Sequence, residues 1–253
     1  MGKTKTSRDA YGRALLAQYE GGEPTTEIVE REDGYIDTGA DPGAYFEPYN
    51  RWPAMERRAV RFASGRVLDI GCGAGRHALH LQDAGLDVTG IDNSPGAVEV
   101  CRRRGLQKVY CRSISEVSRF KPASFDTVLM LGNNFGLFGS AAGAKRILRE
   151  LARITSPGAR IIAGTRDPHL TTDPDHLSYQ RRNRQRGRLP GQIRLRVRYG
   201  RLIGDWFDYL LVSPKEMESL LAGSSWEIER LIGTGEPGYY AILRKRPAGS
   251  RGQ

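Results

Sequence analysis

Short apolar runs alternate with amphipathic stretches along the chain from Arg66 onward. The runs that predict strands are RVLDI, DVTGI, KVYC, FDTVLML and ARIIAG. The stretches between them that predict helices are RHALHLQDAG, PGAVEVCRRRG and GAKRILRELARIT. Short apolar strands that alternate with helices are typical of a parallel sheet covered on both faces. The pattern therefore predicts a doubly wound α/β fold with a mostly parallel, Rossmann-like sheet.

The alternation changes after the fifth predicted strand. QIRLRVRYGRLIGDWFDYLLV alternates with period two around Tyr199 and Gly200, which predicts a β-hairpin. We interpret residues 165–205 as a cap inserted after the fifth strand. The stretch Ser213 to Ile232 then predicts a helix with Ser213 as its N-cap, and YYAILRKR predicts a last strand.

The segment before the first predicted strand has a different pattern. Residues up to about Asp41 are polar, with one short helical candidate from Asp9 to Tyr19, and predict an arm outside the core. Aromatic residues between Tyr45 and Trp52 precede a helix expected near Pro53, and we expect them to close over a bound ligand. The chain is thus divided into an arm and lid segment over 1–52, a main domain over 53–246 and a disordered tail over 247–253.

Composition narrows the class of protein. The 253 residues are 39% hydrophobic and 27% charged, and no apolar run approaches the roughly 18 residues that span a membrane. The start of the chain lacks the apolar core of a secretory signal, so a cytoplasmic location is expected. Cys72, Cys101 and Cys111 are predicted to be reduced thiols, and no metal site is predicted because no ligand spacing for one is present.

The formal net charge of +10 is concentrated in one block without acidic residues. Its arginines are Arg181, Arg182, Arg184, Arg186, Arg188, Arg194, Arg196, Arg198 and Arg201. Such a block could attract phosphate or an anionic substrate, or it could be the solvated face of an extended segment.

The turn after the first strand carries the clearest chemistry, in VLDIGCGAGRHALHL. Gly71, Gly73 and Gly75 let the backbone approach a ligand at the carboxyl end of a strand. Asp69 would repel a pyrophosphate but attract a cationic amine, and Asp92 ends the next strand, where an acid accepts hydrogen bonds from ribose hydroxyls. The two acids suit a nucleoside with a positively charged amino-acid tail.

VLDIGCGAGRHALHLQDAGLDVTGIDNSP, with FDTVLML downstream, closely resembles the class I S-adenosylmethionine-dependent methyltransferases, in their small-molecule branch. The resemblance implies that S-adenosylmethionine is the cofactor and S-adenosylhomocysteine the product. It implies backbone contacts from Gly71, Cys72 and Gly73, with Asp69 near the methionine amine and Asp92 on the ribose. The remaining residues implied at the cofactor are Asn93, at the adenine edge, and Ser113, Ile114, Ser115 and Leu131. Many relatives carry an acid where CRSISEV has Ser113 to Ser115, so adenine recognition would depend on backbone and apolar contacts.

Candidate acceptor residues are less clearly marked, because methyl transfer from a sulfonium depends mainly on alignment of the nucleophile. Asn133 and Asn134 follow the fourth strand, where the methyl would lie, although asparagines in a turn also bond their own backbone. His169 is the histidine placed where a general base could act, or it is an ordinary exposed histidine. Further candidates for substrate contact, or for simple packing, are Tyr45, Tyr49, Arg198 and Tyr209.

Three functions follow from these residues. The first is a methyltransferase for a small-molecule N or O acceptor, possibly anionic, working as a monomer or homodimer without a membrane. The second is an RNA methyltransferase that uses the 181–201 arginine block as a phosphate track. The third is a non-catalytic protein that binds S-adenosylmethionine. Aromatic stacking residues are scarce in the arginine block, which disfavours single-strand RNA recognition.

Overall fold

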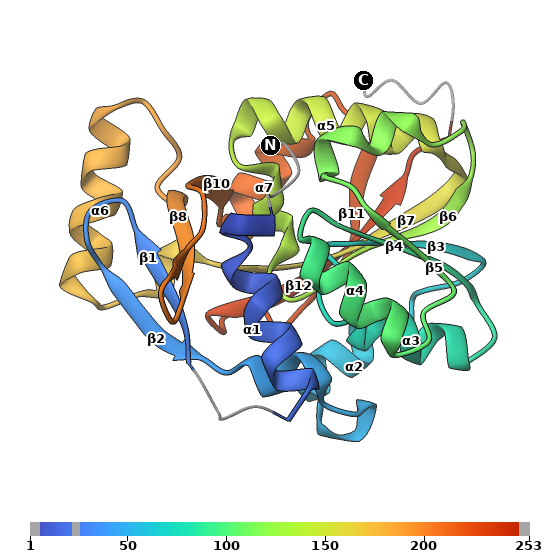
Figure 1. Ribbon diagram of the computed structural model, residues 1–253. Coiled ribbons are helices and arrows are strands. Elements are labelled where there is room, and N and C mark those ends of the chain that lie inside the picture. The colour runs from blue at the N-terminus through green and yellow to red at the C-terminus, as the bar shows by residue number, and fades with distance from the viewer. Residues whose placement is uncertain (1–5, 22–25, 248–253) are drawn as a thin grey trace. The chain divides into compact units, whose positions relative to one another are not determined.

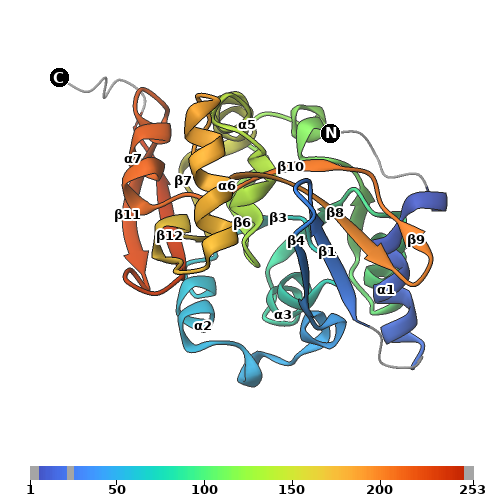
Figure 2. The ribbon, with the colours of Figure 1, turned by 90° about the vertical axis from the view of Figure 1, so that its left-hand side faces the viewer.

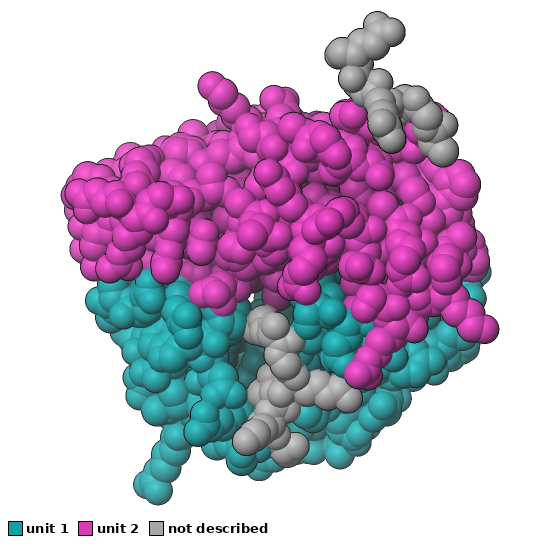
Figure 3. Space-filling model, turned by 90° about the horizontal axis from the view of Figure 1, so that it is seen from above, with its two compact units in different colours: residues 1–52, 68–116, 194–207 teal, residues 53–67, 117–193, 208–253 magenta. Residues whose placement is uncertain are grey.

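The computed structural model describes residues 6–21 and 26–247 of the chain (Figure 1), so nearly all of the predicted tail lies outside the described residues. The chain divides into two compact units, coloured separately in Figure 3. The first comprises residues 1–52, 68–116 and 194–207, and the second comprises residues 53–67, 117–193 and 208–253.

The larger sheet has seven strands in the order β11-β12-β7-β6-β3-β4-β5. Its strands are β3 (Arg66–Ile70), β4 (Asp87–Asp92), β5 (Lys108–Cys111), β6 (Phe125–Met130), β7 (Thr155–Arg166), β11 (Trp226–Ile232) and β12 (Gly238–Lys245). The pairs β4–β5 and β6–β7 are parallel, whereas β12 pairs antiparallel with β7 and with β11. The prediction of an α/β fold with a mostly parallel sheet is confirmed.

The second unit holds helices α2 (Ala54–Val60), α5 (Ala141–Ile154), α6 (Pro174–Gln185) and α7 (Pro214–Leu221) together with strands β6, β7, β11 and β12. Helix α5 buries one apolar face that includes Ile147, Leu148 and Leu151. Helix α7 starts at a capping box in which Ser213 is the N-cap, as predicted.

The predicted helix after Ser213 is too long, because it ends at Leu221 and Trp226–Ile232 forms strand β11. A break in register between Ile228 and Arg230 disturbs the alternation of this strand, so its sequence lacks a clear period of two. Trp226 is fully buried and donates its indole N–H to the Leu148 carbonyl at 3.0 Å, which anchors the strand against α5.

The first unit contains α1 (Ala10–Tyr19), α3 (Arg76–Asp83), α4 (Pro95–Arg103) and strands β4 and β5. It also holds most of a smaller sheet, made of β1 (Glu27–Arg31), β2 (Ile36–Ala40), β8 (Gln192–Tyr199), β9 (Leu202–Ile203) and β10 (Phe207–Leu210). Strands β8 and β9 form the predicted hairpin, with Tyr199 opposite Leu202. Strand β8 also pairs antiparallel with β1, and the two lie side by side in Figure 2. That the hairpin caps an acceptor remains a prediction.

Helix α1 belongs to the core of the first unit and is not the arm that its polar surroundings predict. Ala14 and Leu15 are buried, and Leu15 shares a hydrophobic cluster with residues of the glycine turn and of α4. Asp9 caps α1 and, through its second carboxylate oxygen, accepts hydrogen bonds from Ser94 Oγ at 2.9 Å and Gly96 N at 2.8 Å. These bonds tie the helix to the start of α4.

The arginine block is only partly extended, because Arg181, Arg182 and Arg184 lie on helix α6. None of the helices in the described residues is both long and apolar enough to cross a membrane. Within the same part of the chain, no group of three or more His, Cys, Asp or Glu residues is arranged to hold a metal ion. The three cysteines are free thiols, with the sulfurs of Cys72 and Cys101 3.8 Å apart.

Candidate functional site

The glycine turn between β3 and α3 adopts a backbone that only glycine tolerates well. Gly71, Gly73 and Gly75 all have positive φ, at 70°, 55° and 80°. The amides of Gly71 and Cys72 both donate to the Ile91 carbonyl, at 2.8 and 3.1 Å. The turn follows β3 in the chain, and these two hydrogen bonds attach it to the end of β4.

Asp92, the last residue of β4, is bonded to the glycine turn. Its Oδ2 accepts from Gly73 N at 3.0 Å and its Oδ1 from Ser94 N at 2.9 Å. Burial raises the pKa of Asp92 to about 6, and the hydrogen bonds from Ser94 and Gly73 partly oppose this. Each carboxylate oxygen has a second lone pair, so both can also accept a hydroxyl. This is the group that a ribose diol requires.

Asp69 is the second buried acid of the site. It is 1% exposed, and its Oδ2 has no hydrogen-bond partner among the described residues. Burial raises its pKa to about 7, with a further contribution from the nearby Asp92. A buried carboxylate oxygen without a partner is costly and calls for a cationic or donating ligand group. The site therefore fits the ammonium group of S-adenosylmethionine.

The remaining predicted cofactor residues lie after β4, after β5 and, for Leu131, after β6 in the second unit. Ser113 and Ser115 share a hydrogen bond of 3.1 Å between their hydroxyls, and Ser113 N donates to Glu116 Oε2. Ile114 is buried at the start of a short 3-10 helix over Ile114–Arg119. Asn93 is half-buried after β4, and Leu131 is buried directly after β6, in the second unit.

The aromatic segment predicted as a lid divides into two parts. Tyr49 stacks on His80 with ring centroids 4.3 Å apart, and Trp52 packs edge-on against His77 at 4.7 Å, so both rings pack against α3. Tyr45 is different, because a Cβ placed on Gly73 would lie 3.7 Å from its ring. Tyr45 therefore lies beside the glycine turn, and it packs with Phe46 against the cluster that contains Ala74 of the turn.

Two residues at the turn were not predicted. Tyr11 of α1 places its hydroxyl 2.6 Å from where a Cβ on Gly73 would stand, and its ring packs edge-on against Tyr45 at 5.5 Å. Glu27, the first residue of β1, is buried and hydrogen-bonded to Tyr45. Both lie in polar segments of the sequence, and only their long-range packing places them here.

In the second unit, Asn133 and Tyr209 are brought together. The Tyr209 hydroxyl donates to the Asn133 carbonyl at 2.6 Å, and burial raises the pKa of Tyr209. Asn133 has a positive φ of 67° and caps the 3-10 helix Asn134–Phe138. Tyr209 therefore holds the loop after β6 in shape. Its hydroxyl stays protonated, which is unsuitable for a general base.

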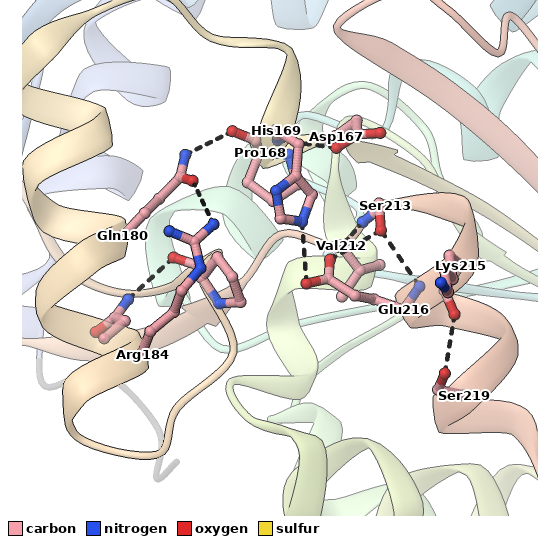
Figure 4. Close-up of polar contacts among 12 residues, drawn as sticks. Asp167, Pro168, His169, Gln180, Arg184, Val212, Ser213, Lys215, Glu216 and Ser219 are labelled. Carbon is pink, nitrogen blue, oxygen red and sulfur yellow. Dashed lines mark hydrogen bonds and ion pairs between the residues drawn. The ribbon is translucent and has the colours of Figure 1, made fainter.

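His169 follows β7 and faces Glu216 of α7 (Figure 4). Its Nε2 lies 3.2 Å from Glu216 Oε1, while Glu216 Oε2 accepts from Ser213 N at 2.8 Å and Ser213 Oγ at 3.1 Å. The backbone N–H of His169 donates to Asp167 Oδ1 at 2.9 Å. The capping box of α7 thus fixes a carboxylate that orients the exposed imidazole. Glu216 was not predicted as a site residue, although SPKE is a capping-box pattern.

Arg198, a predicted substrate residue, is turned toward Glu30. Arg196 makes a bidentate pair with Glu30, at 2.8 Å from both Nε and Nη2, and Arg198 Nη1 adds a contact of 3.3 Å. Arg196 also lies over the Trp206 ring at 4.4 Å. Part of the positive charge predicted to attract an anion is therefore balanced within the smaller sheet.

Comparisons with known proteins agree with this geometry. Residues 67–158 match the family model described as "Methyltransferase domain". The structure is similar to a SAM-dependent methyltransferase from Bacteroides fragilis crystallised with S-adenosyl-L-homocysteine, with a TM-score of 0.82 and 28% identity over 97% of this chain and 99% of that one.

Two curated relatives match part of the chain. A demethylmenaquinone methyltransferase of Renibacterium salmoninarum is 34% identical over 113 residues, which are 44% of this chain and 46% of that protein. A ubiquinone biosynthesis O-methyltransferase of Xanthomonas euvesicatoria is 31% identical over 111 residues, covering 42% and 45%. The chain thus matches about half the length of these relatives.

Proposed function

Because the chain belongs to the class I S-adenosylmethionine-dependent methyltransferase family, we propose that it transfers a methyl group to a nitrogen or oxygen atom of a small molecule. The observation that carries this proposal is the pair of buried acids at the glycine turn, Asp69 with an unpartnered oxygen and Asp92 with free lone pairs. When bound, S-adenosylmethionine supplies an electrophilic methyl on a sulfonium.

The residues of this chain bind and align the reactants. Asp69 holds the cofactor amine and Asp92 the ribose, while Asn93 and the loop over Ser113 to Ser115 border the adenine. Water exclusion and alignment can supply most of the rate of an in-line displacement. Tyr45 lies closest to the turn among the aromatic residues predicted to contact the acceptor. That Asn134 and His169 contact the acceptor stays a prediction.

A small acceptor agrees with the names of the two curated relatives, which refer to quinone biosynthesis. It agrees also with the ion pairs of Arg196 and Arg198 with Glu30, because both arginines are then less available as a phosphate track. RNA remains the alternative acceptor, through the exposed arginines of the block.

Cofactor binding should tighten as pH rises from 5 to 8. In the unliganded protein, burial and then Asp92 raise the pKa of Asp69 to about 7, whereas Arg76 lowers it. A protonated Asp69 cannot attract an ammonium, so the Kd should fall by about tenfold per pH unit below 7 and level off above it. The stability of the unliganded protein should change with pH in the opposite direction. The pKa of Asp69 is higher in the folded protein than its ordinary value of 3.8, so the stability that Asp69 contributes is lost as pH rises through about 7.

Calorimetry with S-adenosylmethionine from pH 5 to 8 measures this dependence. Asp69→Asn removes one of the two titrating acids, so its affinity should be weak and should change only below about pH 6, where Asp92 takes up a proton. An Asp69→Asn variant whose affinity still changed severalfold between pH 6.5 and 8 would assign the effect to another group.

The acceptor class can be tested with methyl-labelled S-adenosylmethionine, incubated in parallel with a small-metabolite extract and with total RNA. We expect label in a low-mass compound and none in RNA. The side chains of Arg181, Arg186 and Arg188 are exposed and make no ion pair among the described residues, so changing all three to alanine should leave the low-mass labelling unchanged. Phosphate-tracking binding would instead weaken with salt by a log–log slope of about 0.7 per contact.

If the wild-type protein labels RNA and the triple alanine variant does not, the acceptor is RNA and not a small molecule. Tight cofactor binding without label in either fraction would favour a non-catalytic S-adenosylmethionine-binding protein. The arginines of α6 and its following turn are better test positions than Arg196, because replacing Arg196 also breaks the pair with Glu30.

A further inference from the structure

Glu27 is a buried acid that the cofactor does not require. It is 4% exposed at the start of β1, and its Oε2 has no hydrogen-bond partner among the described residues. Its other contact is a hydrogen bond with Tyr45. Buried polar atoms in native proteins are nearly always paired, so an unpaired carboxylate oxygen points to a ligand group that completes it.

The surroundings of Glu27 define what that ligand group is. Tyr45 and Tyr11 pack edge-to-face beside it, and both border Gly73 of the glycine turn. Burial, with smaller contributions from Tyr45, Asp92 and Glu27, raises the pKa of Tyr11 well above its ordinary value, so its hydroxyl stays protonated. Two aromatic rings around a carboxylate are a typical recognition site for an organic cation.

The backbone of β1 is irregular at Glu27, which affects the direction of the Glu27 side chain. The pairing of β1 with β2 shifts register between Glu27 and Val29, which is the signature of a bulge. Bulges re-aim side chains and occur often beside active sites. Further along β1, Val29 and Glu30 pair with Val197 and Arg196 of β8, so the strand is held on both sides.

The charge of the region excludes one class of acceptor. Glu27, Asp69 and Asp92 are all buried acids of the first unit, and Tyr11 interacts electrostatically with both Glu27 and Asp92. An anionic acceptor would be repelled by this set, whereas an ammonium group would be attracted.

We propose that Glu27 binds the methyl acceptor, that the acceptor is a small amine, and that Glu27 Oε2 takes its proton. This inference rests on the proposed transfer function. The acceptor enters as an ammonium ion and passes one proton to Glu27. Its freed nitrogen lone pair forms the new N–C bond, the S–C bond of the donor breaks, and that electron pair stays on sulfur. The product leaves as a methylammonium ion, and the proton on Glu27 passes to water.

The test compares Glu27→Gln with Glu32→Gln, which removes the same charge at an exposed position just after β1. The metabolite extract is incubated with labelled S-adenosylmethionine and separated by charge. We expect the label in the cationic fraction, a loss of about 100-fold in Glu27→Gln and no change in Glu32→Gln. The Kd for S-adenosylhomocysteine should be the same in the wild-type protein and both variants, which also shows that Glu27→Gln is folded.

Label in the neutral or anionic fraction would overturn the inference. So would a Glu27→Gln variant with wild-type transfer, or a variant whose only defect is in S-adenosylhomocysteine binding. A large loss in His169→Ala together with unchanged transfer in Glu27→Gln would assign the proton to His169 instead.

A binding measurement separates this inference from the transfer function. If the wild-type protein labels nothing, the proposed transfer has failed, and titration of the S-adenosylhomocysteine complex with benzylamine or benzyl alcohol decides about Glu27. The carboxyl ¹³C resonance of Glu27, identified by its loss in Glu27→Gln, should shift with benzylamine and stay in place with benzyl alcohol. No shift with benzylamine would overturn the amine site.

Discussion

Asp92→Ala should weaken S-adenosylmethionine binding by roughly 10- to 150-fold. In the proposed function the buried carboxylate accepts hydrogen bonds from the ribose hydroxyls, and the loss of a charge-assisted hydrogen bond in a buried site costs about 1.5–3 kcal/mol. The change also removes the bonds from Asp92 to Gly73 N at 3.0 Å and Ser94 N at 2.9 Å, so the glycine turn loses a support. Isothermal calorimetry at pH 8, where Asp92 is ionised, measures the effect.

The matched control is Asp87→Ala, at the other end of the same strand. Asp87 is exposed and pairs with Lys108 at 2.6 Å on the surface, a kind of pair that contributes little to stability. Its replacement should leave the Kd unchanged. If Asp92→Ala binds within twofold of the wild-type protein, the assignment of Asp92 to the ribose is wrong.

Gly96→Ala should be strongly destabilising. A Cβ at Gly96 of α4 would lie 2.7 Å from the carbonyl carbon, the Cα and the oxygen of Gly12 in α1, and backbone atoms cannot move aside as a flexible side chain can. Alanine normally favours a helix over glycine by about 0.5–1 kcal/mol. The overlap outweighs this gain, because overpacking a tight contact costs about 1–3 kcal/mol, occasionally more.

Thermal denaturation of the unliganded protein should show a fall in Tm of roughly 2–9 °C for Gly96→Ala. Helix α1 also carries Tyr11, so the structure around Gly73 should loosen with it. The control is Gly238→Ala, where the nearest atom to a new Cβ lies 4.0 Å away, and its Tm should stay close to that of the wild-type protein. An unchanged Tm in Gly96→Ala would show that α1 and α4 are not in close contact in solution.

The meeting of the glycine turn with its two acids could be predicted from the sequence because its parts are local. Asp69 and the three glycines lie in one strand–turn–helix unit, and Asp92 ends the next strand. Parallel strands bring their carboxyl ends to one edge, so two acids far apart in sequence meet there whatever the rest of the chain does. The Gly73–Asp92 hydrogen bond is the direct result.

The partners of His169 and of the arginine block could not be predicted in the same way. Glu216 lies 47 residues from His169, and its role as the partner of the imidazole depends on where α7 docks. Arg196 and Arg198 read as free charge in the sequence, yet both contact Glu30, more than 160 residues away. Composition counts such charges but contains no information on which of them are paired.

The sequence by itself determined the α/β order of strands and helices, the glycine turn and the acids that flank it, because each of these depends on short-range periodicity and on residues that only certain backbones accept. Only the tertiary structure decided that α1 is a core helix, that Tyr11 stands beside Gly73 and that Glu27 bonds to Tyr45. A polar segment is buried when distant strands and helices cover it, as β8 pairs with β1 and α4 packs on α1. The physical reason is that local patterns report which faces seek burial, whereas the partner that buries them is chosen by contacts between segments far apart in the chain.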